Sequence, residues 1–240
     1  MRPLVLVHGF MGGSDQWKGQ APLGETRPLV TVDLPGFGRN AHLDPIDRIE
    51  GFADWVLSDM SRQGIGTFDL LGHSMGGMIV QEMVHRAPER VARLILYGTG
   101  AVGVLPGRFE PISTSMERAR TDGPAATARR ISATWFLDTE SAPAYADCAA
   151  IAEKSSLPVI LAGLDAMQSW SGEKNLARIT AETLILWGDR DRTYPWSQTE
   201  TLWRGITGSS LAVIPGCAHA VHMEEPALFN RLVERFLSLV

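Results

Sequence analysis

The sequence predicts a single α/β domain built around a mainly parallel sheet, and three observations carry this prediction. Short apolar runs rich in Val, Ile and Leu recur along the 240 residues, as buried parallel strands do. The segments between the earlier runs are long enough for crossover helices. Each run ends in turn residues, where the functional loops of parallel sheets gather. The runs are residues 4–7, 29–32, 67–71, 94–97, 183–187 and 211–214.

Composition and charge narrow the class of protein. A hydrophobic content of 45% suits one large core, and a net charge of -5 without a basic cluster argues against a nucleic-acid surface. The early apolar run at residues 4–7 is too short for a signal peptide or a membrane span. Cys148 and Cys217 lie far apart and are expected to be free thiols. We therefore expect a soluble, cytoplasmic protein with a small-molecule partner and no metal site, in an oligomeric state that composition does not define.

The first strands lead directly into loops of unusual composition. Residues 4–7 run into His8-Gly9, and residues 29–32 run into Asp33-Leu34-Pro35-Gly36. Residues 67–71 end at Gly72, and a helix is predicted after them up to Arg86, because apolar side chains recur there at helical spacing and Pro88 follows. The apolar positions of this helix are Met78, Ile79, Met83 and Val84.

The turn between the third strand and this helix reads Gly72-His73-Ser74-Met75-Gly76. A serine bracketed by glycines at a strand-to-helix turn is the pattern of a nucleophile elbow, in which a strained backbone holds the hydroxyl clear of the sheet. The N–H of Met75 opens the helix and can face a developing oxyanion. The bare pattern also arises by chance, so an ordinary turn serine is the alternative.

The strand rhythm breaks between residues 101 and 179. Alanine-rich stretches with arginines and tryptophans, punctuated by Gly123-Pro124, Pro143 and Pro158, replace it. We interpret residues 1–100 and 180–240 as the core and residues 101–179 as an inserted helical cap. Large apolar side chains of the cap are candidate walls of a substrate pocket, with attachment of the cap to the core as the alternative role. They are Trp135, Phe136, Met167 and Trp170.

The last two strands supply partners for a nucleophilic serine, which needs a histidine base and an acid that orients it. Asp189 and Asp191 both follow the strand at 183–187, and the residues alone do not rank them. His219 follows the strand at 211–214, whereas His222 lies further from the strand end. Serine, aspartate and histidine thus occur in the order used by α/β-hydrolases.

With these residues assembled, the chain resembles the α/β-hydrolase superfamily over nearly all of its length outside the cap. The resemblance implies Ser74 as nucleophile, Asp191 as acid and His219 as base. It also implies that the N–H groups of Phe10 and Met75 form the oxyanion hole and that no cofactor is needed. The motifs that carry it are residues 6–10, 33–38, 72–76, 187–191 and 216–219, followed by Glu224-Glu225-Pro226.

Members of this superfamily usually have a β-hairpin before the strand that leads into His8-Gly9, whereas this chain starts on that strand. The resemblance therefore implies about six strands, no N-terminal β-hairpin, and an edge position for residues 29–32. His8 and His73 are expected to be structural, the first by shaping the oxyanion loop.

The cap resembles that of 3-oxoadipate enol-lactonases in Arg118-Ala119-Arg120-Thr121-Asp122-Gly123 and in Trp135-Phe136. Those enzymes commonly carry arginine directly before the tryptophan, where this chain has Thr134. The absence of that guanidinium predicts that short uncharged esters or lactones are better substrates than carboxylate-bearing enol-lactones. Arg129 or Arg130 is the alternative source of the missing charge, unless both lie on a solvated helix face.

The resulting hypothesis is a serine hydrolase that cleaves a small carboxylic ester or lactone through an acyl-enzyme. An enol-lactonase-like activity, carbon–carbon bond hydrolysis in aromatic degradation and cofactor-free perhydrolysis are neighbouring hypotheses. Relatives that cleave carbon–carbon bonds often carry tryptophan directly after the histidine, where this chain has Ala220. A non-enzymatic ligand receptor on the same fold is the alternative of another class.

Overall fold

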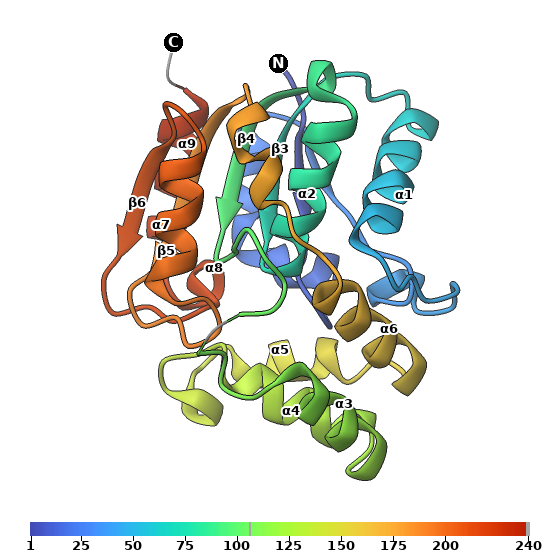
Figure 1. Ribbon diagram of the computed structural model, residues 1–240. Helices are drawn as coiled ribbons and strands as arrows, with labels where there is room; N and C mark the ends of the chain where they lie inside the picture. The colour runs from blue at the N-terminus through green and yellow to red at the C-terminus, as the bar shows by residue number, and fades with distance from the viewer. Residues whose placement is uncertain (106, 239–240) are drawn as a thin grey trace.

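The computed structural model describes residues 1–105 and 107–238, which fold around one six-stranded parallel sheet (Figure 1). The strand order is β2-β1-β3-β4-β5-β6, so the prediction of about six parallel strands is confirmed and β2 is an edge. The strands are β1 (Leu4–Val7), β2 (Leu29–Thr31), β3 (Phe68–His73), β4 (Val91–Tyr97), β5 (Glu182–Gly188) and β6 (Ser210–Ile214).

Each face of the sheet carries its own hydrophobic core, because successive strand side chains point to opposite faces. Val5 and Val7 of β1 join the cluster that contains residues of α1 and α2, whereas Leu4 and Leu6 join the cluster that contains residues of α9 and η1. Outside the segment between β4 and β5, the α-helices that contribute to the first cluster are α1 (Ile49–Arg62), α2 (Met75–Arg86) and α7 (Trp196–Gly205). Those of the second are η1 (Ser14–Glu25), α8 (Val221–Glu224) and α9 (Pro226–Leu237).

The segment between β4 and β5 forms a helical layer below the carboxyl ends of the strands (Figure 1). Its described helices are α3 (Ile112–Thr121), α4 (Pro124–Ala133), α5 (Tyr145–Ala152) and α6 (Leu157–Gln168). The remaining short 3₁₀ helices are η2 (Gly38–Asn40), η3 (Pro88–Arg90), η4 (Thr139–Ser141) and η5 (Glu173–Arg178).

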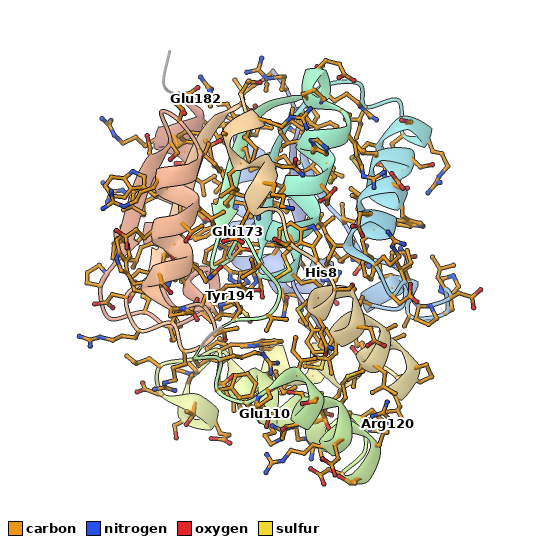
Figure 2. All side chains as sticks on the ribbon, viewed as in Figure 1. His8, Glu110, Arg120, Glu173, Glu182 and Tyr194 are labelled. Atoms are coloured by element: carbon orange, nitrogen blue, oxygen red, sulfur yellow. The ribbon has the colours of Figure 1, made fainter. Side chains whose placement is uncertain are left out.

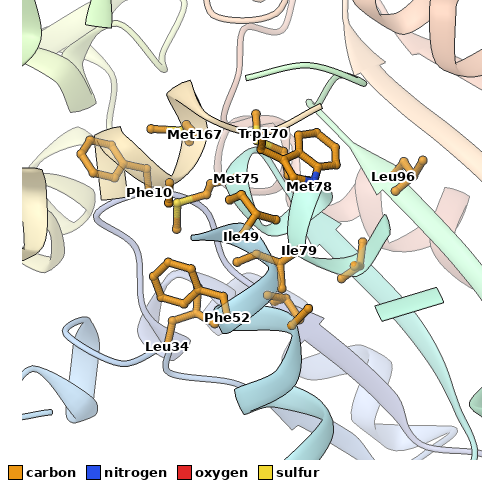
Figure 3. Packing of buried hydrophobic residues seen from close by; sticks show 14 of the residues in the cluster. Phe10, Leu34, Ile49, Phe52, Met75, Met78, Ile79, Leu96, Met167 and Trp170 are labelled. Atoms are coloured by element: carbon orange, nitrogen blue, oxygen red, sulfur yellow. The ribbon is translucent and has the colours of Figure 1, made fainter. Parts of the chain in front are cut away.

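Polar and apolar contacts bind this cap to the core. The N–H of Ala220 donates to the carbonyl of Trp135 at 2.9 Å, and Glu224 accepts the N–H of Leu137 at 2.6 Å. The indole N–H of Trp170 donates to Glu82 at 2.9 Å. Figure 3 shows Trp170 and its neighbour Met167 in the same buried cluster as core residues. These hydrogen bonds attach the cap to α2 and to the segment that follows β6.

Cys148 and Cys217 are free thiols, as the sequence predicted. Burial raises the pKa of Cys148 to about 12 and that of Cys217 to about 11, so both thiols stay protonated at neutral pH. Within the described residues, no helix is long and apolar enough to cross a bilayer.

Candidate active site

Ser74 occupies the turn between β3 and α2 with φ 57° and ψ -121°, a region that side-chain-bearing residues rarely adopt. The flanking glycines make this turn possible. A Cβ atom on Gly72 would lie 2.4 Å from the carbonyl oxygen of Gly76, and one on Gly76 would lie 2.4 Å from the carbonyl oxygen of Val7. Because neither glycine carries a side chain, the strand and the helix can approach each other this closely. The tight turn between them holds the backbone of Ser74 in its strained conformation.

Asp191 and His219 form a buried pair at the carboxyl ends of the strands. The loop after β5 places Asp191 Oδ2 2.8 Å from His219 Nδ1, and Asp191 Oδ1 accepts the N–H groups of Thr193 and Tyr194 at 2.7 and 3.0 Å. A carboxylate at Nδ1 fixes the neutral imidazole with its proton on that nitrogen, so Nε2 is left as a proton acceptor. These contacts hold the carboxylate in one orientation.

Asp189 has a different position from Asp191, although both follow β5. Its carboxylate accepts the N–H of Gly216 at 2.7 Å and lies 3.5 Å from the guanidinium of Arg190. It thereby closes the loop that leads to His219. The structure therefore brings Asp191, and not Asp189, to the imidazole.

The other histidines near His219 are held in the neutral form. Burial lowers the pKa of His222 to about 3, and its Nδ1 lies 3.0 Å from the hydroxyl of Tyr97. Burial and the neighbouring imidazoles lower the pKa of His73, whose ring stacks on Tyr97 at a centroid distance of 4.4 Å. His73 Nε2 lies 3.2 Å from the carbonyl oxygen of His219. His73 and His222, together with Tyr97, thus pack against the loop that carries His219.

The loop after β1 lies against Ser74 and carries the first predicted oxyanion donor. A Cβ atom on Gly9 would approach that of Ser74 to 2.8 Å. His8 Nδ1 donates to the Gly9 carbonyl at 2.7 Å, while its Nε2 accepts the N–H of Leu34 at 3.1 Å. Burial lowers the pKa of His8 to about 4, which keeps it neutral in this bridging role.

The backbone N–H groups of Phe10 and Met75 have no acceptor in the described part of the chain. Met75 is the first residue of α2, so its N–H is one of those that an α-helix leaves unsatisfied at its N-terminus. Two such donors beside a serine suit a site where negative charge develops on a substrate oxygen.

Tyr194 is a residue of the site that sequence reasoning missed. Its ring stacks on that of His219 at a centroid distance of 5.6 Å and an interplanar angle of 17°. Its phenol lies within reach of the Ser74 side chain, and burial raises its pKa far above the usual value. Figure 2 shows Tyr194 at the border between core and cap. No motif marks it, and its distance of three residues from Asp191 is the only signal in the sequence.

A narrow cavity of about 20 Å³ lies over Ser74 between the core and the cap. Trp135 and Met167 of the predicted pocket set line it. Phe136 instead packs in the cap against Tyr145 at a centroid distance of 6.4 Å, and Trp170 is bonded to Glu82 as described above. The volume is that of about one water molecule, so an acyl group enters this inner cavity only if its walls move.

The two arginines considered as carboxylate ligands do not line this cavity. Arg129 is exposed and paired with Glu153, and Arg130 donates to Glu110 at 2.8 Å. The hydroxyl of Thr134 donates to the carbonyl of Ile131. Within the described residues, no group of His, Cys, Asp and Glu side chains could hold a metal ion.

Comparisons with known proteins agree with this architecture. A sequence model described as the alpha/beta hydrolase family matches residues 4–232. A 2-hydroxy-6-oxononadienedioate/2-hydroxy-6-oxononatrienedioate hydrolase of Klebsiella pneumoniae is 28% identical over 257 residues, which cover 98% of this chain and 86% of that protein.

Solved structures show the same fold. The enol-lactonase of Burkholderia xenovorans LB400 superposes with a TM-score of 0.91 at 21% identity, over 99% of this chain and 92% of that one. A thermophilic esterase of Thermogutta terrifontis gives a TM-score of 0.87 at 24% identity, over 99% and 89%. With the match over residues 4–232 and the parallel sheet, these likenesses establish that the chain belongs to the alpha/beta hydrolase family.

Proposed function

We propose that this hydrolase cleaves a small carboxylic ester or lactone through an acyl-enzyme on Ser74. His219 serves as the base, Asp191 as the acid that orients it, and the N–H groups of Phe10 and Met75 as the oxyanion hole. The observation that carries the proposal is the buried Asp191–His219 pair at 2.8 Å, together with a serine held at positive φ in a strand-to-helix turn. These features supply an oriented base and a nucleophile whose side chain lines the cavity between core and cap.

The proposed reaction has two half-reactions. In the first, Ser74 Oγ attacks the carbonyl carbon while His219 Nε2 takes the hydroxyl proton. The carbon–oxygen bond of the ester then breaks, and the imidazolium returns the proton to the leaving oxygen. In the second, His219 deprotonates a water that attacks the acyl group, which releases a carboxylic acid and restores the serine. For a lactone, the leaving hydroxyl stays on the acyl chain until that second step.

Labelling with a fluorophosphonate tests the nucleophile without knowledge of the natural substrate. We expect the label on the peptide that contains Ser74, and Ser74→Ala should lose both the label and 4-nitrophenyl acetate hydrolysis while circular dichroism stays unchanged. Ser197→Ala, on the exposed start of α7, is the matched control and should keep both. A protein that binds ligands without labelling would instead be a receptor on this fold.

Carbon–carbon bond hydrolysis is the second candidate, because the Klebsiella pneumoniae relative is named as a hydrolase of 2-hydroxy-6-oxononadienedioate and 2-hydroxy-6-oxononatrienedioate. In this chain Ala220 follows His219, and its N–H donates to the carbonyl of Trp135. Turnover of a 2-hydroxy-6-oxo-dienoate with a higher kcat/KM than that of any short ester would favour this candidate over ester hydrolysis.

A further inference from the structure

A single guanidinium lies in the wall of the cavity over Ser74. Among the described residues that line this cavity, the polar side chains besides Ser74 are Arg108, Thr193 and Tyr194, and Arg108 alone is charged. The other walls are apolar, with Phe10, Trp135 and Met167 among them. A cation in such surroundings is poorly hydrated, so an anion that reaches it interacts more strongly than in water.

Arg108 also borders a second, outer cavity of about 400 Å³, which Ser74 does not line. Leu105, Arg108 and Ile112 line both cavities and therefore separate them. The volume of the outer cavity lies in the range of small-molecule sites. A substrate with its reactive carbonyl at Ser74 and its remaining atoms in the outer cavity would have to pass Arg108.

The guanidinium of Arg108 is held in place but is not neutralised. Its Nη1 donates to the Glu110 carbonyl at 2.6 Å and to the Ser115 hydroxyl at 3.1 Å. Its Cζ lies over the Phe109 ring, 4.5 Å from the ring centroid. Within the described residues, no carboxylate oxygen lies within 4.0 Å of it. Burial lowers the pKa of Arg108, and the nearby charge of Glu110 opposes this shift without reversing it.

The nearest carboxylate, that of Glu110, is engaged elsewhere. Its Oε1 accepts Arg130 Nη1 at 2.8 Å, and its Oε2 lies 3.5 Å from Arg118 Nη1. Figure 2 places Glu110 within the cap. Two cations therefore share this carboxylate, which leaves the charge of Arg108 available to a ligand.

We propose that Arg108 is the anion-binding group of the substrate site and that the preferred substrates carry a carboxylate beside the reactive ester or lactone. This inference rests on the proposed function of Ser74 and names its substrate class. It replaces the preference for uncharged esters, which followed from Thr134, because the structure supplies a guanidinium from a different segment of the chain.

A pair of esters that differ only in one charge tests the proposal. The substrates are 4-nitrophenyl hydrogen glutarate and its methyl ester, each assayed with wild type, Arg108→Gln and Arg108→Lys. Loss of a charge-assisted contact should lower kcat/KM of Arg108→Gln for the carboxylate ester by about ten- to a hundredfold. The loss of kcat/KM on the methyl ester should be smaller, since this ester lacks that contact. Arg108→Lys should recover part of the loss because it restores the charge.

Arg120→Gln is the matched control, since Arg120 is exposed on α3 and lines neither cavity. It should leave the ratio of kcat/KM for the two esters unchanged. If Arg108→Gln lowers kcat/KM by the same factor for both esters, the proposal is overturned, while ester hydrolysis at Ser74 still stands.

Calorimetric titration with glutarate separates the two proposals, because it requires no turnover. We expect glutarate to bind wild type and not Arg108→Gln. If neither ester is hydrolysed but this binding difference is found, the role proposed for Ser74 fails and the anion site stands. If glutarate does not bind wild type, the anion site is refuted.

Discussion

Replacement of Asp191 by asparagine should lower kcat about a thousandfold, and the structure gives the reason. The carboxylate lies 2.8 Å from His219 Nδ1 and is buried, so it stabilises the imidazolium that forms when Ser74 is deprotonated. For charge centres about 4 Å apart at an effective dielectric constant of about 20, this attraction is about 4 kcal/mol. A loss of that size in the transition state corresponds to a factor of about 10³ in rate.

The geometry of the loop also predicts a second effect of Asp191→Asn. Because Oδ1 accepts two backbone N–H groups, an asparagine would keep its oxygen there and turn its NH₂ group toward His219 Nδ1. The imidazole would then accept at Nδ1 and carry its proton on Nε2, which is the wrong tautomer for a base.

The assay is kcat and kcat/KM for 4-nitrophenyl acetate hydrolysis, with thermal unfolding of each variant as the folding control. Asp189→Asn is the matched variant, because its contact with the Gly216 N–H persists through the amide oxygen. It should stay within about fivefold of wild type, in line with the loss of about 1 kcal/mol for a weakened hydrogen bond. A larger loss for Asp189→Asn than for Asp191→Asn, with both variants folded, would refute the reasoning.

Three further predictions follow from particular contacts. Tyr194→Phe keeps the ring stacked on His219 but removes the hydroxyl beside Ser74. We expect kcat/KM to fall about tenfold with little change in Tm. An unchanged kcat/KM would show that the hydroxyl has no role. Gly76→Ala places a Cβ atom 2.4 Å from the Val7 carbonyl oxygen. It should lower the free energy of unfolding, measured by urea titration, by about 3 kcal/mol or more. Gly64→Ala, at a position with positive φ and no atom near the added Cβ, measures the cost of backbone strain alone. In the folded chain the pKa of His8 is lowered to about 4 and that of His222 to about 3, from the ordinary 6.5. The unfolded chain therefore binds more protons on acidification. The free energy of unfolding should fall from pH 6.5 toward pH 4. The difference at His8 corresponds to about 3 kcal/mol, and equal free energies of unfolding at pH 7 and pH 4.5 would contradict this account.

The strands and the serine turn were predictable because their causes are local. Buried parallel strands must be apolar along their length. The turn at Ser74 needs Gly72 and Gly76 because there is no room for a side chain at either position. The strands and the turn therefore each leave a pattern in the sequence. The sequence placed the start of β4 three residues late, because the small Ala92 and the charged Arg93 interrupt the run of large apolar side chains at this end of the strand.

The choice between Asp189 and Asp191 was not available from composition or spacing. It depends on a turn in which the Asp191 N–H donates to the Gly188 carbonyl at 3.0 Å and Asp191 is directed toward His219. The superfamily resemblance had favoured Asp191 without that geometry.

The residues that sequence reasoning missed lie where cap and core meet. Arg108 and Tyr194 are 86 residues apart and become neighbours of Ser74 only when the cap packs over the strand ends. The same packing turns Phe136 and Trp170 away from the cavity, although their residue types suited a pocket wall. Tertiary placement of this kind leaves no periodic signal along the chain.

The central claim is that Ser74 carries the acyl group during turnover. Rapid acid quenching during 4-nitrophenyl acetate hydrolysis, followed by mass spectrometry of the digested protein, tests it directly. The account predicts one acetyl adduct, on the peptide that contains Ser74, which forms in wild type and is absent from Ser74→Ala. Turnover without an adduct on that peptide, or an adduct that persists in Ser74→Ala with activity retained, would contradict it.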